Sequence, residues 1–162
     1  MFYEFSQNNS YGYFDVNDKV CHRIIIEADS GSEAIEKAEE IGCYWDGVSK
    51  GIDCSCCGDR WSKYYDEIDV KEFAKGYGAF IYTEAYPNYV EEWEKRYGMY
   101  QRVTEFSIKD EGKSFQSYGC RIAFRDIEEY AQYLSNEYGW TDPDTRIYYK
   151  NGEVKEIFTE KR

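Results

Sequence analysis

Alternating and continuous runs of apolar residues predict a series of short strands along this chain. The strongest strand signal is the segment 20–28, whose continuous β-branched run, Ile24-Ile25-Ile26, predicts a strand covered on both faces near the centre of a sheet. Asn151-Gly152 stands between the last two runs and predicts a closing hairpin with a two-residue type I′ turn. The other predicted strands lie at 2–5, 79–83, 102–108, 114–118, 120–124, 146–149 and 153–158.

Helical spacing of apolar residues predicts two helices and a third, shorter one. Before the first, Ser30 and Glu33 have the spacing of a capping box, and Gly42 stands where a glycine ends a helix. Asp126 and Glu129 repeat the capping spacing before the second helix. The three helices are predicted at 30–42, 126–139 and 88–97.

Length and charge limit the class of protein. The 162 residues suit one domain of ordinary size, so the pattern predicts a single α+β domain over residues 1–162, with a mostly antiparallel sheet. A net charge of −12, from 32 acidic and 20 basic residues, disfavours direct binding of nucleic acid or anionic lipid. Basic proteins or neutral small molecules are the expected partners. The alternative is that this charge serves solubility alone.

The N-terminus sets expectations about the cellular compartment. It lacks a basic segment followed by an apolar run, and no span approaches the roughly 20 apolar residues of a membrane helix. The sequence therefore predicts a soluble protein that is not secreted. In a reducing compartment, clustered cysteines more often bind metal or react than form disulfides.

The most distinctive chemistry lies at 52–61, where three of the six cysteines occupy four positions. Cys54 and Cys57 form a C-x-x-C pair followed by Gly58, the arrangement of a zinc knuckle. Such a tight turn directs two thiolates at one point, and the glycine lets backbone amides approach the sulfurs. The pattern predicts one structural Zn²⁺ ion.

A closed zinc site needs four ligands, so other residues must complete the knuckle. The candidates are Cys56 or Cys43, and one of the neighbours Cys21 and His22, whose side chains are expected to leave opposite faces of a strand. Three alternatives remain open. The cysteines are core thiols, or they form a redox pair, or one cysteine of the block is a nucleophile with His22 as its base.

The sequence favours binding over catalysis. It has one histidine and no glycine-rich phosphate loop, H-E-x-x-H or G-x-S-x-G motif, so an enzyme is the less favoured interpretation. Arg and Trp are enriched at interface hot spots, which predicts binding residues on both sides of the cysteines. These are Tyr44, Trp45, Arg60 and Trp61. The alternative is that both tryptophans are core residues and that Arg60 pairs with Asp53 or Asp59.

Three segments carry a resemblance to known sequences: MFYEFSQNNS at 1–10, VCHR at 20–23 and GIDCSCCGDRW at 51–61. They resemble a family of small, functionally uncharacterised tailed-bacteriophage proteins. The likeness covers the chain up to the end of the cysteine block and, loosely, the terminal hairpin. Family members carry proline where this chain has Ser55, so its turn lacks that rigid residue.

The resemblance implies a viral protein made in the cytoplasm of a host bacterium. Small accessory proteins of this kind bind host components, so the expected function is inhibition of a host defence protein. Two alternatives remain open, the sequestration of a nucleotide signal and the mimicry of DNA by an acidic surface. An anionic nucleotide needs clustered Arg or Lys, so the acid excess favours a protein partner.

Overall fold

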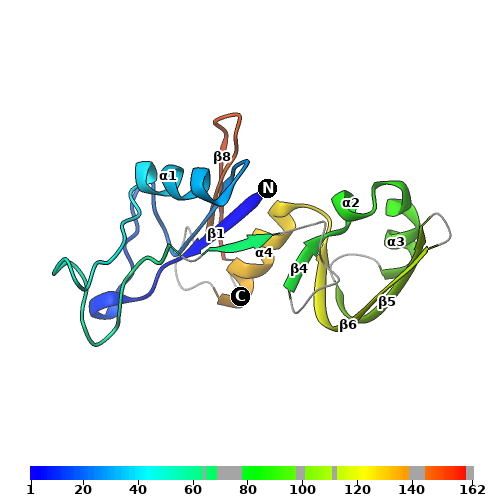
Figure 1. Ribbon diagram of the computed structural model, residues 1–162, viewed down its shortest axis with the longest axis horizontal. Helices are drawn as coiled ribbons and strands as arrows, with labels where there is room; N and C mark the ends of the chain where they lie inside the picture. The colour runs from blue at the N-terminus through cyan, green and yellow to red at the C-terminus, as the bar shows by residue number, and fades with distance from the viewer. Residues whose placement is uncertain (64, 69–77, 98–100, 111–112, 139–144, 160–162) are drawn as a thin grey trace. The chain divides into compact units, whose positions relative to one another are not determined.

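The computed structural model describes residues 1–63, 65–68, 78–97, 101–110, 113–138 and 145–159 (Figure 1). The strands are β1 Phe2–Ser6, β2 Arg23–Glu27, β3 Asp66–Ile68, β4 Gly78–Ile81, β5 Gln101–Asp110, β6 Lys113–Phe124, β7 Thr145–Tyr148 and β8 Val154–Ile157. The helices are α1 Gly31–Ile41, α2 Tyr82–Ala85, α3 Val90–Tyr97 and α4 Ile127–Tyr138, with short 3₁₀ turns η1 Ser10–Gly12 and η2 Pro87–Tyr89. This confirms the α+β class and the three predicted helices, apart from position 139, which lies outside the described residues.

The strands form two sheets. One has the order β3-β1-β2-β7-β8 and the other the order β4-β6-β5. The pairs β1–β2, β5–β6 and β7–β8 are antiparallel, as the mostly antiparallel prediction requires, whereas β2–β7 and β4–β6 are parallel. β2 is central in its sheet, and its residues Ile24–Ile26 are fully buried on both faces, which confirms the interpretation of the β-branched run.

The contacts within the chain divide it into two compact units, residues 1–67 with 131–162 and residues 68–130. In the first unit, α1 lies along one face of the five-stranded sheet (Figure 1), and its Ala34 and Ala38 pack in one core with Ile24 and Ile26 of β2. Whether both units unfold together, as one domain, stays a prediction. None of the helices in the described ranges is long and apolar enough to cross a membrane.

Side chains close the starts of both long helices in the same way. Ser30 Oγ accepts a hydrogen bond of 3.2 Å from Glu33 N, and the Glu33 carboxylate accepts one of 2.7 Å from Asp29 N. At α4, Glu129 N donates to Asp126 Oδ1 at 2.8 Å, and the Glu129 carboxylate accepts from the amide of the residue before Asp126. The predicted caps are therefore present, but each glutamate reaches one residue further back than in a standard capping box.

α2 is a helix where the sequence predicts the end of a strand. The strand stops at Ile81, and Tyr82 begins a short helix. Tyr82 stacks on Trp93 of α3 with ring centroids 5.6 Å apart, and its hydroxyl donates to Glu94 at 2.9 Å. Tyr86 also stacks on Trp93, at 5.6 Å. These contacts to a distant part of the sequence override the local strand preference.

The closing hairpin is present, but its predicted type I′ turn is wrong. That turn needs positive φ at both central residues, and in this loop only Gly152 has it, at 88°. Gly152 N donates to Tyr149 O at 3.0 Å, and Tyr149 N donates to Glu153 O at 2.9 Å. The loop therefore has three residues and ends on a left-handed glycine. Asn151 instead accepts a hydrogen bond from Glu153 N at 2.9 Å.

Candidate metal centre

Three cysteines meet on the loop between α1 and β3. The sulfur atoms of Cys54, Cys56 and Cys57 all lie within 4.8 Å of one another, and those of Cys56 and Cys57 are 3.6 Å apart. Thiolates on one tetrahedral zinc ion, each at about 2.3 Å from the metal, stand about 3.8 Å apart. The size and the donor atoms of this group, the cysteine triad, therefore fit one metal ion.

The turn that forms the triad depends on Gly58. Cys57 N and Gly58 N both donate to Cys54 O, at 3.2 and 3.0 Å. Gly58 has φ of 87°, a left-handed conformation that other residues adopt at a cost of roughly 1–2 kcal/mol. The predicted approach of backbone amides to a sulfur is confirmed at Cys54, where, after the bond with the Cys56 thiol, hydrogen bonds from the Cys56 and Cys57 amides help to lower the pKa of the thiol. The Gly58 amide bonds to the Cys54 carbonyl oxygen.

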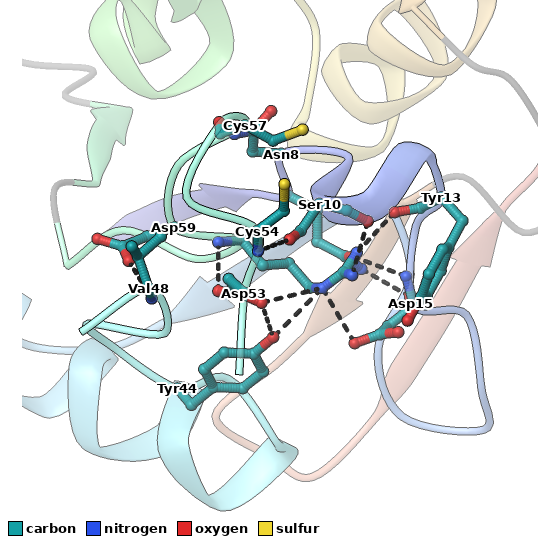
Figure 2. A network of polar contacts seen from close by, with 12 residues as sticks. Asn8, Ser10, Tyr13, Asp15, Tyr44, Val48, Asp53, Cys54, Cys57 and Asp59 are labelled. Atoms are coloured by element: carbon teal, nitrogen blue, oxygen red, sulfur yellow. Dashed lines mark hydrogen bonds and ion pairs between the residues drawn. The ribbon is translucent and has the colours of Figure 1, made fainter. Parts of the chain in front are cut away.

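The N-terminal loop holds the triad from one side. Cys54 N donates to Ser10 Oγ at 2.7 Å, and Asn8 Nδ2 donates to Cys57 O (Figure 2). Asn8 N donates to Arg60 O at 2.8 Å, just after the triad. Two segments that lie more than forty residues apart in sequence are thus joined at the backbone of the cysteines.

Arg60 lies beneath both segments and joins them. Its side chain is 2% exposed, and its guanidinium Nη1 and Nη2 donate to the carbonyl oxygens of Tyr13 and Ser10 at 2.7 and 3.1 Å. Its Nε lies 3.2 Å from Asp15 Oδ2 and 3.3 Å from the Tyr44 hydroxyl (Figure 2). A planar guanidinium offers five donors, so it can hold several loop carbonyls at once.

Asp53 is the buried carboxylate that faces Arg60. Its Oδ2 accepts from Arg60 N at 2.7 Å, its Oδ1 accepts from the Tyr44 hydroxyl at 2.6 Å, and Oδ1 lies 3.8 Å from Arg60 Nε. Burial, and then the bond to Asp53, raise the pKa of Tyr44 to about 12. A Cβ atom on Gly47 would stand 1.9 Å from Asp53 Oδ2, so the chain needs glycine there.

The four residues predicted to form a binding surface lie mostly inside the protein. Arg60, Trp45 and Trp61 are buried, and Tyr44 is half-buried with its hydroxyl already bonded. Trp45 also donates from its indole to Glu39. Burial leaves these side chains little area for a partner, and their contacts in the structure support the cysteine loop from beneath. Their role in binding a partner stays a prediction. The pairing of Arg60 with Asp53 and the core placement of both tryptophans, given above as alternatives, fit the structure.

The other predicted ligands lie apart from the triad. Cys21 and Cys43 are in the hydrophobic core, where burial raises the pKa of Cys43 to about 12 and so opposes its thiolate form. His22 is buried with its ring 4.1 Å from that of Phe14. The group of metal-ligating atoms found in the described ranges contains none of these three. The core-thiol alternative therefore holds for Cys21 and Cys43 but not for the triad.

The triad is already prepared to bind a cation. A hydrogen bond with the Cys56 thiol lowers the pKa of Cys54 to about 7 and raises the pKa of Cys56 to about 11. Cys54 is therefore the more acidic thiol of the two, and a bound metal ion would displace the proton of Cys56. Metal binding at such a site releases protons and strengthens as the pH rises.

The comparisons with known proteins identify a family. A family model described as a domain of unknown function, DUF7296, matches residues 1–162. No curated protein and no solved structure matches the chain. The match covers the whole of this chain, whereas the resemblance seen in the sequence covered chiefly the N-terminal segments.

Proposed function

The chain belongs to the DUF7296 family, and we propose that it is a metal-dependent binding protein, not an enzyme, whose cysteine triad holds one zinc ion. The grouping of three sulfurs within 4.8 Å carries this proposal. Thiolates select soft or borderline ions such as Zn²⁺ over Mg²⁺ or Ca²⁺. The buried Arg60 and its partners fix the loop, so a metal ion finds the sulfurs already in place.

Metal content tests the zinc proposal. Protein purified without chelator is expected to carry one equivalent of zinc, and Cys54→Ser or Cys56→Ser is expected to weaken zinc binding by at least about tenfold, because each removes a thiolate. Cobalt(II) loading should give sulfur-to-metal charge-transfer absorption that weakens with each cysteine removed. Ser55→Ala is the matched control, since Ser55 lies within the same turn and is exposed. Less than about a tenth of an equivalent of zinc in the wild type would contradict the proposal.

The partner proposal follows from charge. Inhibition of a host defence protein, which the family resemblance implies, is supported by the net charge of −12 and by the exposed acidic side of α1, formed by Glu36, Glu39 and Glu40. Such a surface complements a basic protein and repels a nucleotide. The zinc proposal rests on the cysteine triad and the partner proposal on the acidic surface, so each is tested on its own.

Salt dependence tests the partner proposal. A protein complex recovered from host lysate is expected to weaken on the order of tenfold between low and high ionic strength, because salt screens exposed charges. Glu36→Gln with Glu40→Gln should reduce this dependence without unfolding the chain. Salt-insensitive capture of a small nucleotide, with no protein partner, would contradict the proposal and favour sequestration of a signal.

A further inference from the structure

The triad supplies three ligands, and its neighbours do not supply a fourth. No other His, Cys, Asp or Glu joins the group in the part of the chain that the structure describes. Asp53, the nearest acidic residue in sequence, has both oxygens bonded, to Arg60 N and the Tyr44 hydroxyl. Asp59 accepts a hydrogen bond from Val48 N at 2.8 Å. The acids that flank the cysteines thus serve the loop backbone.

The triad lies at the protein surface. Cys56 is exposed, and Cys54 and Cys57 are half-buried. A tetrahedral ion bound to three surface thiolates keeps its fourth position directed away from them. Catalytic and exchange-active zinc sites have such an open position, whereas closed structural sites do not.

We infer that a metal ion on the triad leaves its fourth position open to solvent, and that this position takes the histidine imidazole of a partner protein. The inference rests on the proposed metal binding and names the group through which a partner engages it. Zinc sites with three cysteines and one histidine are a common closed set, so a single imidazole would complete the coordination.

Charge selects imidazole over a fourth thiolate or a carboxylate. Three thiolates around Zn²⁺ already leave one net negative charge, within a chain of net charge −12. Another anionic ligand would add to this excess, whereas a neutral imidazole adds no charge. Imidazole is a borderline nitrogen donor that suits zinc, and it binds the ion more strongly than the water it displaces.

A second copy of the chain cannot provide this imidazole. The sequence contains one histidine, His22, and that side chain is 6% exposed and packed against Phe14. The accessible ligands of a second copy in the described residues are cysteines and carboxylates, and either would add negative charge. The donor is therefore expected to come from a different protein.

Exposed apolar side chains lie on the two loops that meet where Cys54 N donates to Ser10 Oγ. Tyr11, next to Ser10, is 60% exposed, and Ile52, two residues before Cys54, is also exposed. Tyr11 has a φ of 54°, which is unusual for a bulky residue. Tyr13 covers the buried Arg60 guanidinium with its ring, 4.9 Å from Cζ, and is itself more than half exposed. These residues offer apolar contact area to a peptide segment that carries the histidine.

The test follows the visible absorption of the cobalt(II)-loaded full chain. Imidazole is expected to change the cobalt bands saturably. The dissociation constant for zinc is then measured with free zinc held by a chelator buffer. Imidazole at ten times its own dissociation constant should lower the dissociation constant for zinc about elevenfold, because imidazole binds only the zinc-loaded site and so stabilises it. Ser55→Ala should behave as wild type. The peptide acetyl-Leu-His-Leu-amide should bind more tightly than acetyl-Gly-His-Gly-amide, and Tyr11→Ser should remove that difference.

Each other outcome overturns the inference. One equivalent of bound metal with no response to imidazole means a closed site, and the zinc proposal then stands alone. A response to glutathione but not imidazole, or a zinc-dependent dimer, means that the fourth ligand is a thiolate. Equal affinity for the two peptides means that the site recognises the imidazole group alone and not the protein segment around it. No cobalt absorption at all means that the proposed function fails as well.

Discussion

Arg60→Ala is expected to lower the free energy of unfolding by about 3–5 kcal/mol, the range found when one partner of a buried ion pair is removed. The substitution would leave the buried Asp53 carboxylate without its cation, 3.8 Å away. It would also remove the donors that the carbonyl oxygens of Ser10 and Tyr13 accept from. Urea denaturation monitored by circular dichroism measures the loss.

An exposed arginine provides the control for this substitution. Arg125 is 63% exposed and lies 3.5 Å from Glu94, so Arg125→Ala should cost less than about 1 kcal/mol. Asp53→Asn combined with Arg60→Met should recover part of the stability that Arg60→Ala loses, because no buried charge is left unpaired. Equal, small effects of Arg60→Ala and Arg125→Ala would show that the Arg60 network does not hold the loop.

Local signals made much of the fold predictable from the sequence. The apolar run around β2 and the serine and aspartate caps of α1 and α4 act through neighbouring residues, so their patterns predicted the elements. The helix at Tyr82 depends on stacking against Trp93, eleven residues later, and no local pattern encodes it. The hairpin turn was misassigned because Asn-Gly occurs in both two-residue and three-residue loops.

In the candidate site, too, the sequence predicted local contacts but not contacts between residues far apart in the chain. The spacing of Cys54 and Cys57 predicted that their thiols lie close together, because the tight turn between them is local and does not depend on the rest of the fold. The remaining ligands were misplaced, since whether Cys21 or His22 reaches the turn depends on the packing of the core. Arg60 stands among polar neighbours in sequence, which suggests exposure. The carbonyl oxygens that accept its hydrogen bonds belong to Ser10 and Tyr13, and only the folded chain brings these residues next to Arg60.

Trp61→Ala and Trp93→Ala are each expected to cost about 3–5 kcal/mol, because both remove a large, fully buried aromatic side chain. Trp61 belongs to the core with Phe5 and Trp45, and Trp93 to the core with Phe80 and Tyr86. The two residues lie in different compact units, residues 1–67 with 131–162 and residues 68–130. The pair of substitutions therefore tests the prediction of a single domain.

Amide hydrogen exchange, followed separately in β2 and β4, gives the measurement. If the chain is one cooperative domain, either substitution should lower the free energy of opening, measured from exchange rates, by the same amount in both strands. Both strands then exchange only through global unfolding. Val154→Ala, at a half-exposed position of β8, is the control and should change neither strand by more than about 0.5 kcal/mol. Faster exchange confined to β2 in Trp61→Ala and to β4 in Trp93→Ala would instead establish two domains. The cysteine triad, which lies wholly within residues 1–67, would then belong to the first domain alone.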